Sequence, residues 1–251
     1  MTARPLILIA GWGHPGKAMR PLKEALEEYQ GQVTSTGELW QTTPAAALPC
    51  SPGLSRYAAG LRNLLASFGG RAVVIGWSMG GIVALEAACK HPELFQRLVI
   101  ISGTARFGAG SGDPPGVSAI VLRAMALGLR RTPDHVLSAY YDQVYAPQPF
   151  SMVAPAMRAR DAARPDCDEL LQGLDYLQRT DLRASLNQLA VPAMVVHGRE
   201  DRIVPWQAGE WLGRALDSSH WLCYDGLGHA LPIQAAPRLA ADVRAFLGDT
   251  A

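Results

Sequence analysis

The stretch Ala72-Val73-Val74-Ile75-Gly76-Trp77-Ser78-Met79-Gly80 joins an apolar run to a helix-like segment over residues 81–88. Its second half, Gly76–Gly80, has the form G-x-S-x-G, and the order strand, motif, helix is typical of a nucleophile elbow. In such a turn the serine hydroxyl stands clear of the sheet. Glycines flank it because a Cβ would clash in the crowded, strained backbone. The motif therefore predicts that Ser78 is a nucleophile at the end of a strand.

Outward from this motif, short apolar runs alternate with helix-like stretches. The expected strands are Leu6–Ala10, a weak one at Gln32–Thr36, Ala72–Gly76, Leu98–Ser102, Ala193–His197 and His220–Tyr224. The expected helices are Ala18–Tyr29, Ser55–Ser67, Gly80–Lys90, Trp206–Leu216 and Ala235–Leu247. Nearly continuous apolar strands are typical of parallel strands covered on both faces. Their alternation with helices predicts a mostly parallel, doubly wound α/β sheet.

One long segment, from about residue 104 to residue 189, breaks this alternation. It contains helical patterns broken by Pro and Gly, at Val117–Arg131, Pro133–Tyr145, Met152–Arg160 and Cys167–Gln178. A structureless loop of this length is implausible in a compact domain. We therefore expect a helical lid over residues 105–187, inserted into a core formed by residues 1–104 and 188–251.

The composition limits the classes of function. The chain has 251 residues, 49% of them hydrophobic, with a formal net charge of +1, which suits a single globular domain and disfavours nucleic-acid binding. No apolar run reaches 18 residues, so no membrane span is expected. The cysteines are scattered without a C-x-x-C pair, which leaves zinc and redox sites unsupported and favours the cytoplasm. The motifs call for no metal and no cofactor.

A serine hydroxyl is a weak nucleophile at neutral pH, so it needs a base, and the base needs an orienting carboxylate. Two candidates follow Ser78 in the chain order Ser, Asp, His. Asp201 comes after the fifth expected strand, and His229 comes after the sixth. We predict Asp201 as the acid and His229 as the base. Glu200 competes for the acid role, and Asp201 could alternatively cap the following helix.

The oxyanion of an acyl-transfer intermediate also needs hydrogen-bond donors. Met79, the residue after the nucleophile, is expected to supply one backbone N–H. The second is expected from Trp12 in Gly11-Trp12-Gly13, after the first strand. Nearby, His14 is a candidate for lining the site, whereas His197 ends a strand and is interpreted as structural.

Several motifs together carry a family resemblance: Gly11–Gly13, Gly76–Gly81, His91–Glu93, and Leu171–Leu177 leading to Thr180–Arg183. With these, the chain resembles α/β-hydrolases and, within them, the pimeloyl-[acyl-carrier protein] methyl ester esterases of biotin synthesis. The resemblance implies an α/β-hydrolase fold and a serine carboxylesterase whose triad is Ser78, Asp201 and His229.

The same resemblance implies how a substrate is held. Trp77 would line the acyl pocket together with Trp12, Met79 and the lid residue Phe150. Basic lid residues would meet an acidic acyl carrier protein, namely Arg123, Arg130, Arg131 and Arg158, with Arg160 and Arg164 nearby. The alternative for these arginines is an ordinary solvated helical face.

Two departures from the family pattern bear on substrate choice. Members usually have His before Gly-x-Gly, where this chain has Ala10, so the loop must be held in another way. Members also often carry D-x-x-G-x-G-x-S after the next strand, and residues 38–44 have no such motif. Alternative functions are a general short-chain carboxylesterase, a C–C bond hydrolase or a cofactor-free haloperoxidase. A non-catalytic ligand receptor is a further alternative.

Overall fold

The protein is built on a six-stranded parallel sheet with the strand order β2-β1-β3-β4-β5-β6. The computed structural model describes residues 5–27, 29, 31–41, 53–69, 71–110, 114–149 and 166–248. Its strands are β1 (Leu6–Ala10), β2 (Gly31–Ser35), β3 (Ala72–Trp77), β4 (Phe95–Ile101), β5 (Ala193–Gly198) and β6 (Ser219–Tyr224). All six predicted strands are present, and β4 begins three residues earlier than expected.

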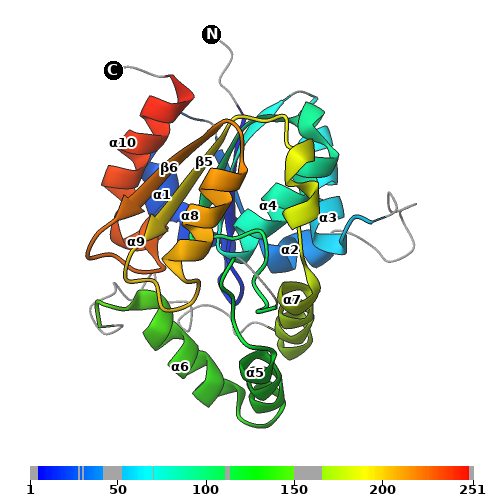
Figure 1. Cartoon of the computed structure of the whole chain (residues 1–251), viewed down its shortest axis with the longest axis vertical. Coiled ribbons are helices and arrows are strands. Elements are labelled where there is room, and N and C mark those ends of the chain that lie inside the picture. Colours follow the sequence, from blue (N-terminus) through cyan, green and yellow to red (C-terminus); the bar gives the residue numbers. More distant parts are fainter. Residues whose placement is uncertain are drawn as a thin grey trace.

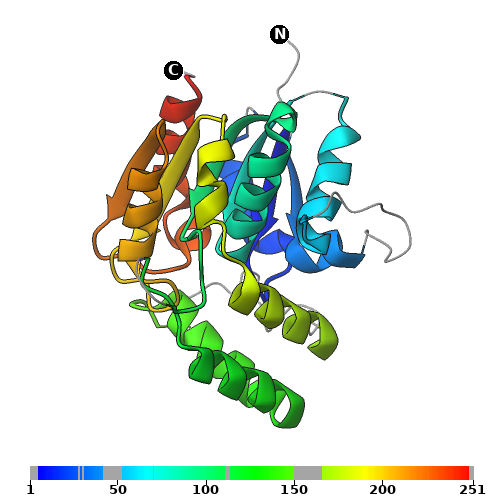
Figure 2. The ribbon, with the colours of Figure 1, turned by 45° about the vertical axis from the view of Figure 1, so that its right-hand side comes forward.

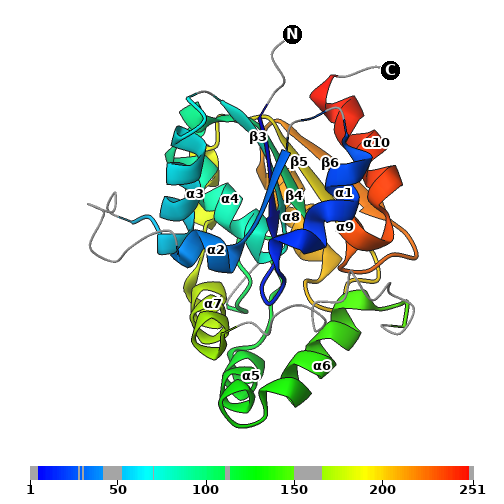
Figure 3. The ribbon, with the colours of Figure 1, turned by 180° about the vertical axis from the view of Figure 1, so that it is seen from behind.

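Helices cover both faces of this sheet, which confirms the predicted doubly wound fold (Figure 1). On one face lie α3 (Arg56–Ala66), α4 (Met79–Lys90) and α8 (Trp206–Ala215). On the other lie α1 (Arg20–Ala25), α9 (Leu231–Gln234) and α10 (Ala236–Leu247), as Figure 3 shows from behind. Because both faces are covered, every residue of β1, β3 and β5 is buried.

The main differences from the expected helices lie in the first part of the chain, and the short helix α9 near its end was not predicted either. The helix predicted at Ala18–Tyr29 is a 3-10 turn (Gly16–Met19) followed by α1, which ends at Ala25. Pro21 lies in the first turn of α1, where its missing N–H costs no hydrogen bond within the helix. This favours a helix that begins at Arg20. A short helix, α2 (Thr36–Gln41), follows β2 and was not predicted.

Three further helices, α5 (Ala119–Arg131), α6 (Pro133–Tyr145) and α7 (Cys167–Arg179), lie beyond the carboxyl ends of the strands (Figure 2). They occupy the predicted lid segment between β4 and β5, whereas the helix expected at 152–160 lies outside the described residues. Ser118 and Asp166 cap α5 and α7 with their side chains. The Leu182 N–H donates to the Ala105 carbonyl at 2.9 Å, which ties the two ends of the insertion together.

Candidate active site

Ser78 lies between β3 and α4 in the backbone geometry of a tight elbow. Its φ of 56° and ψ of −123° are rare for a residue with a side chain. A Cβ on Gly76 would lie 2.4 Å from the Gly80 carbonyl oxygen, and one on Gly80 would lie 2.6 Å from that of Ile9. Glycine is therefore required at both ends of the motif, and the turn lifts Ser78 to the edge of the sheet.

The loop after β1 approaches Ser78 with its backbone. A Cβ on Gly11 would lie 2.9 Å from the Cβ of Ser78 and 3.4 Å from its Oγ, so only glycine allows this approach. Trp12, which follows, and Met79, the first residue of α4, are the two predicted oxyanion donors. The Met79 N–H has no acceptor within the helix because the first N–H groups of an α-helix are unpaired.

Asp201 and His229 meet as predicted, although they are 28 residues apart in the chain. His229 Nδ1 lies 2.7 Å from Asp201 Oδ2, and both side chains are fully buried. The other oxygen, Oδ1, accepts the N–H groups of Ile203 at 2.8 Å and Val204 at 2.9 Å. An ionised carboxylate only accepts, so Nδ1 carries the ring proton and Nε2 presents its lone pair. Among the described residues, the buried Nε2 has no hydrogen-bond partner, which leaves it free to act as a base.

The charge state of Asp201 follows from its neighbours. Burial alone would raise the pKa of this carboxyl group. The charge of His229 and the hydrogen bonds from His197 and His229 outweigh burial and hold the pKa below its ordinary value. Glu200, the competitor for the acid role, is exposed, and its N–H is bound to the Leu227 carbonyl. The carboxylate beside His229 therefore belongs to Asp201 and is ionised at neutral pH.

His197 is the residue whose contact with the site was missed by sequence reasoning. Its Nε2 lies 3.0 Å from Asp201 Oδ2 and 3.0 Å from the Val204 carbonyl oxygen, and the ring is fully buried. A Cβ on Gly209 of α8 would lie 2.3 Å from Nδ1, so that glycine makes room for the ring. No sequence signal indicated this contact, because a spacing of four residues brings side chains together on a helix, whereas His197 lies in strand β5 and Asp201 in the loop after it.

Trp77 lies elsewhere than the family resemblance implied. Its side chain is fully buried and is not among the described residues that line the cavity at Ser78. Its Nε1–H instead donates to the His229 carbonyl at 2.8 Å, and the Ser102 hydroxyl donates to the same oxygen at 3.1 Å. We therefore correct its predicted role: Trp77 holds the backbone of the predicted base beside the elbow.

A largely apolar cavity of about 570 Å³ opens at Ser78 beneath the lid helices. Trp12, Phe107 and Met125 line it together with Tyr140, Leu174 and other residues of α5, α6 and α7. Met79, predicted to contact substrate, does not line this cavity with its side chain, and Phe150 lies outside the described residues. The cavity offers Ser78 an apolar chain-binding space.

Of the arginines predicted to contact a carrier protein, those that the structure describes lie on α5. Arg123, Arg130 and Arg131 are all exposed there. Ile120, on the same helix, is 76% exposed, so this helix presents both cations and apolar surface to solvent. Arg158, like Arg160 and Arg164, lies outside the described residues.

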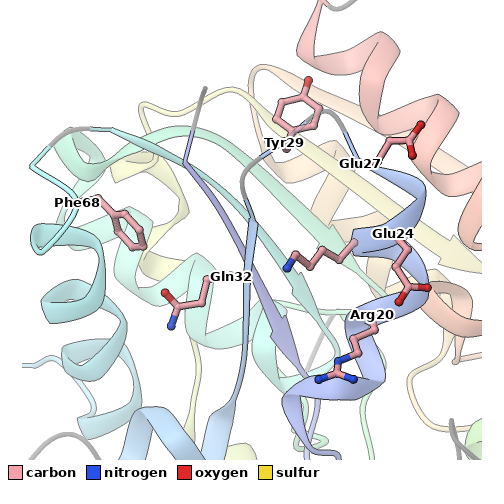
Figure 4. A pocket seen from close by; sticks show the side chains of 7 residues that line it. Arg20, Glu24, Glu27, Tyr29, Gln32 and Phe68 are labelled. Atoms are coloured by element: carbon pink, nitrogen blue, oxygen red, sulfur yellow. The ribbon is translucent and has the colours of Figure 1, made fainter. Parts of the chain in front are cut away.

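A second depression, of about 650 Å³, lies away from the elbow and is lined by residues of α1 and β2 and by Phe68 (Figure 4). Side chains of both charges line it, including Arg20, Glu24 and Glu27. Within the part of the chain that the structure describes, no cluster of His, Cys, Asp and Glu could hold a metal ion. No helix in that part is long and apolar enough to cross a membrane.

Residues 6–243 match the family described as "Alpha/beta hydrolase family", and the chain belongs to this family. Curated relatives include the pimeloyl-[acyl-carrier protein] methyl ester esterase of Xanthomonas campestris pv. campestris, 30% identical over 96% of this chain and 94% of the relative. The protein of the same name from Nitrosomonas europaea is 34% identical over 64% of this chain and 65% of its own length. The chain is a carboxylic ester hydrolase of this family.

Solved structures agree with the fold. An esterase from Exiguobacterium antarcticum superposes with a TM-score of 0.85 at 17% identity, over 98% of this chain and 92% of that one. A bromoperoxidase from Bacillus anthracis superposes with a TM-score of 0.84 at 20% identity, over 99% of this chain and 93% of that one. At these identities the similarity shows the α/β-hydrolase fold, which is shared by enzymes of different chemistry.

Proposed function

We propose that this chain hydrolyses the methyl ester of an acyl group borne by an acyl carrier protein, as in biotin synthesis, with Ser78, Asp201 and His229 as its triad. The observation that carries the catalytic part is the buried contact of 2.7 Å between His229 Nδ1 and Asp201 Oδ2 beside the Ser78 elbow. The names of the curated relatives support the substrate.

The reaction proceeds in two halves. His229 Nε2 takes the proton of Ser78 Oγ as Oγ bonds to the ester carbonyl carbon, and the backbone N–H groups of Trp12 and Met79 hold the resulting oxyanion. Collapse breaks the bond to the methoxy oxygen, which leaves as methanol with the proton from His229. Water, deprotonated by His229, then attacks the acyl-serine. The bond between the acyl carbon and Ser78 Oγ breaks, His229 returns the proton to Oγ, and the carboxylic acid is released.

The cavity suits a long, apolar acyl group. Its wall combines Phe107, Leu174, Leu177 and residues of α5 and α6, so a methylene chain would bury apolar surface along it. Beside it, α5 offers Arg123, Arg130 and Arg131 to solvent, which supports docking of an acidic carrier.

The triad is tested with Ser78→Ala and a p-nitrophenyl short-chain ester. Turnover should fall to the level of buffer, while the thermal midpoint stays close to that of the parent. Full turnover by this variant would remove Ser78 from the mechanism.

The carrier substrate is tested separately, by reversing charge on α5. The variant Arg123→Glu/Arg130→Glu/Arg131→Glu should lower kcat/KM for the carrier-bound methyl ester by about tenfold or more, and leave that for a free methyl ester unchanged. Lys90→Glu, an exposed charge reversal on α4, is the matched control. If the variant lost kcat/KM equally on both esters, or if the parent did not prefer the carrier-bound ester, the protein would be a general carboxylesterase and the carrier substrate would be wrong.

Complementation of a biotin-requiring strain that lacks its own esterase tests the biological assignment. The parent chain should restore growth and Ser78→Ala should not. If the parent chain were an active esterase but did not restore growth, the proposed role in biotin synthesis would be wrong, whereas the proposed ester hydrolysis would stand.

A further inference from the structure

In the loop after β1, the carbonyl groups of three successive residues accept hydrogen bonds; these residues are Gly11, Trp12 and Gly13. The Gly11 carbonyl accepts from the His14 N–H at 3.2 Å, and the Trp12 carbonyl accepts from His14 Nδ1 at 2.9 Å. Because the peptide unit is planar, holding the Gly11 carbonyl also sets the direction of the Trp12 N–H, the proposed oxyanion donor. The geometry of the donor therefore depends on whatever holds this loop.

Two of the holding groups come from the lid. The Tyr140 hydroxyl donates to the Trp12 carbonyl at 3.2 Å, and the Tyr141 hydroxyl donates to the Gly13 carbonyl at 2.7 Å. Both tyrosines belong to α6 and are 128 residues from the loop in the chain. The Tyr140 ring also packs edge-on against the Trp12 indole, with centroids 4.8 Å apart. Helix α6 thus binds the loop through both hydroxyls and one ring.

Helix α7 and His14 also form hydrogen bonds with Trp12. Trp12 Nε1–H donates to the Leu170 carbonyl of α7 at 2.8 Å. A carbonyl can only accept, so His14 Nδ1 carries the ring proton, and Nε2 is left to face the Tyr145 hydroxyl at 3.5 Å. Burial lowers the pKa of His14 to about 4, partly offset by the bond to Trp12, so the ring is neutral at neutral pH.

We infer that Tyr140 and Tyr141 are positioning residues for the oxyanion loop, and that the loop is ordered for catalysis only while α6 is docked on it. This inference rests on the proposed function, since it concerns the proposed donor Trp12. Ala10, before Gly11, has a side chain that cannot form hydrogen bonds. The hydrogen bonds that hold this loop come instead from the lid, from the hydroxyls of Tyr140 and Tyr141. Lid position and the reactivity of Ser78 are thereby linked.

The test compares Tyr140→Phe, Tyr141→Phe and the double variant with the parent on a p-nitrophenyl ester. Each single change should lower kcat about tenfold, and the double change about a hundredfold, with KM changed less than about twofold. Tyr176→Phe is the matched control. Its hydroxyl donates to Glu86 at 2.8 Å, so this variant loses a buried hydroxyl of α7 away from the loop. Its kcat should stay within about twofold of the parent value.

A second readout separates positioning from general loosening of the lid. Phenylboronic acid bonds to a nucleophilic serine and places a boron-bound oxygen where the oxyanion forms. Its inhibition constant should rise in proportion to the loss of kcat/KM in the tyrosine variants and stay unchanged in Tyr176→Phe. If the double variant does not fold, the two single variants with parental thermal midpoints carry the comparison.

The outcomes distinguish this inference from the proposed function. Tyrosine variants with kcat and boronate inhibition like those of Tyr176→Phe, together with an inactive Ser78→Ala, would overturn the positioning role alone. An active Ser78→Ala would overturn the proposed function, and the inference with it.

Discussion

His197 Nε2 lies 3.0 Å from Asp201 Oδ2, the same oxygen that lies 2.7 Å from His229 Nδ1. One carboxylate oxygen is thus shared by two buried imidazoles, while the other accepts two backbone N–H groups. A buried carboxylate with this number of donors is fixed in orientation as well as in charge. The link from His197 to His229 therefore runs through Asp201.

We expect His197→Leu to lower the free energy of unfolding by about 2 kcal/mol, because a donor to a buried carboxylate is lost. The kcat should fall about tenfold as Asp201 loses its second fixed partner. His197→Gln can place an amide N–H near the position of Nε2 and should recover most of the kcat. Denaturant unfolding and steady-state kinetics measure both effects, and parental kcat in His197→Leu would limit His197 to packing.

Asp201→Asn should lower kcat by about 10³- to 10⁴-fold with little change in KM. An amide can donate to Nδ1 and so favours the His229 tautomer that has no lone pair at Nε2. Glu200→Gln, a change of the same kind one residue earlier at an exposed position, is the control and should retain full activity. The reverse result, with Glu200→Gln inactive, would exchange the roles of the two acids.

The fold could be predicted because its signals are local. Each strand is a short apolar run, and the turn at Ser78 is specified by Gly76 and Gly80, whose missing Cβ atoms the turn requires. The meeting of Asp201 with His229 followed from strand order, since parallel strands end at the same edge of a sheet. These features depend on neighbours in the chain and on the general form of the sheet.

What the sequence did not predict depends on contacts between distant segments. Nothing near Trp77 indicates that its indole N–H reaches the His229 carbonyl, 152 residues away. The hydrogen bonds of Tyr140 and Tyr141 likewise depend on how α6 docks, which is decided by packing of the whole lid. Side-chain periodicity predicts a helix, but not which backbone groups its hydroxyls meet.

Gly173 of α7 should resist substitution because the Trp12 indole packs against it. A Cβ there would lie 2.5 Å from Trp12 Cδ1 and 2.8 Å from Nε1. We expect Gly173→Ala to displace the indole, strain its bond to Leu170 and lower kcat at least tenfold. Gly213→Ala on α8 controls for the same exchange in a helix, since the nearest atom to its Cβ would be 3.2 Å away. Activity of Gly173→Ala equal to that of Gly213→Ala would contradict the prediction.

The buried imidazole of His14 should make stability fall as the pH drops below the ordinary histidine range. In the unfolded chain His14 takes up a proton near pH 6.5, whereas in the folded protein burial lowers its pKa to about 4. Between these values the unfolded state binds more protons, so the free energy of unfolding decreases with falling pH. Over this interval the loss amounts to about 3 kcal/mol. Asp201, whose folded pKa is also lowered, adds its own loss only below its ordinary value of 3.8.

His14→Asn isolates this effect, because an amide N–H can still donate to the Trp12 carbonyl but does not titrate in this range. Urea unfolding of the parent and the variant at intervals from pH 7.5 to 4.5 should give curves that diverge below about pH 6.5, with the variant losing less stability. His135→Asn, which removes an exposed imidazole of α6 and leaves His14 in place, should keep the steep fall of the parent. Parallel curves for the parent and His14→Asn would mean that His14 takes up its proton equally in the folded and unfolded states, and that the burial of its ring does not hold it neutral.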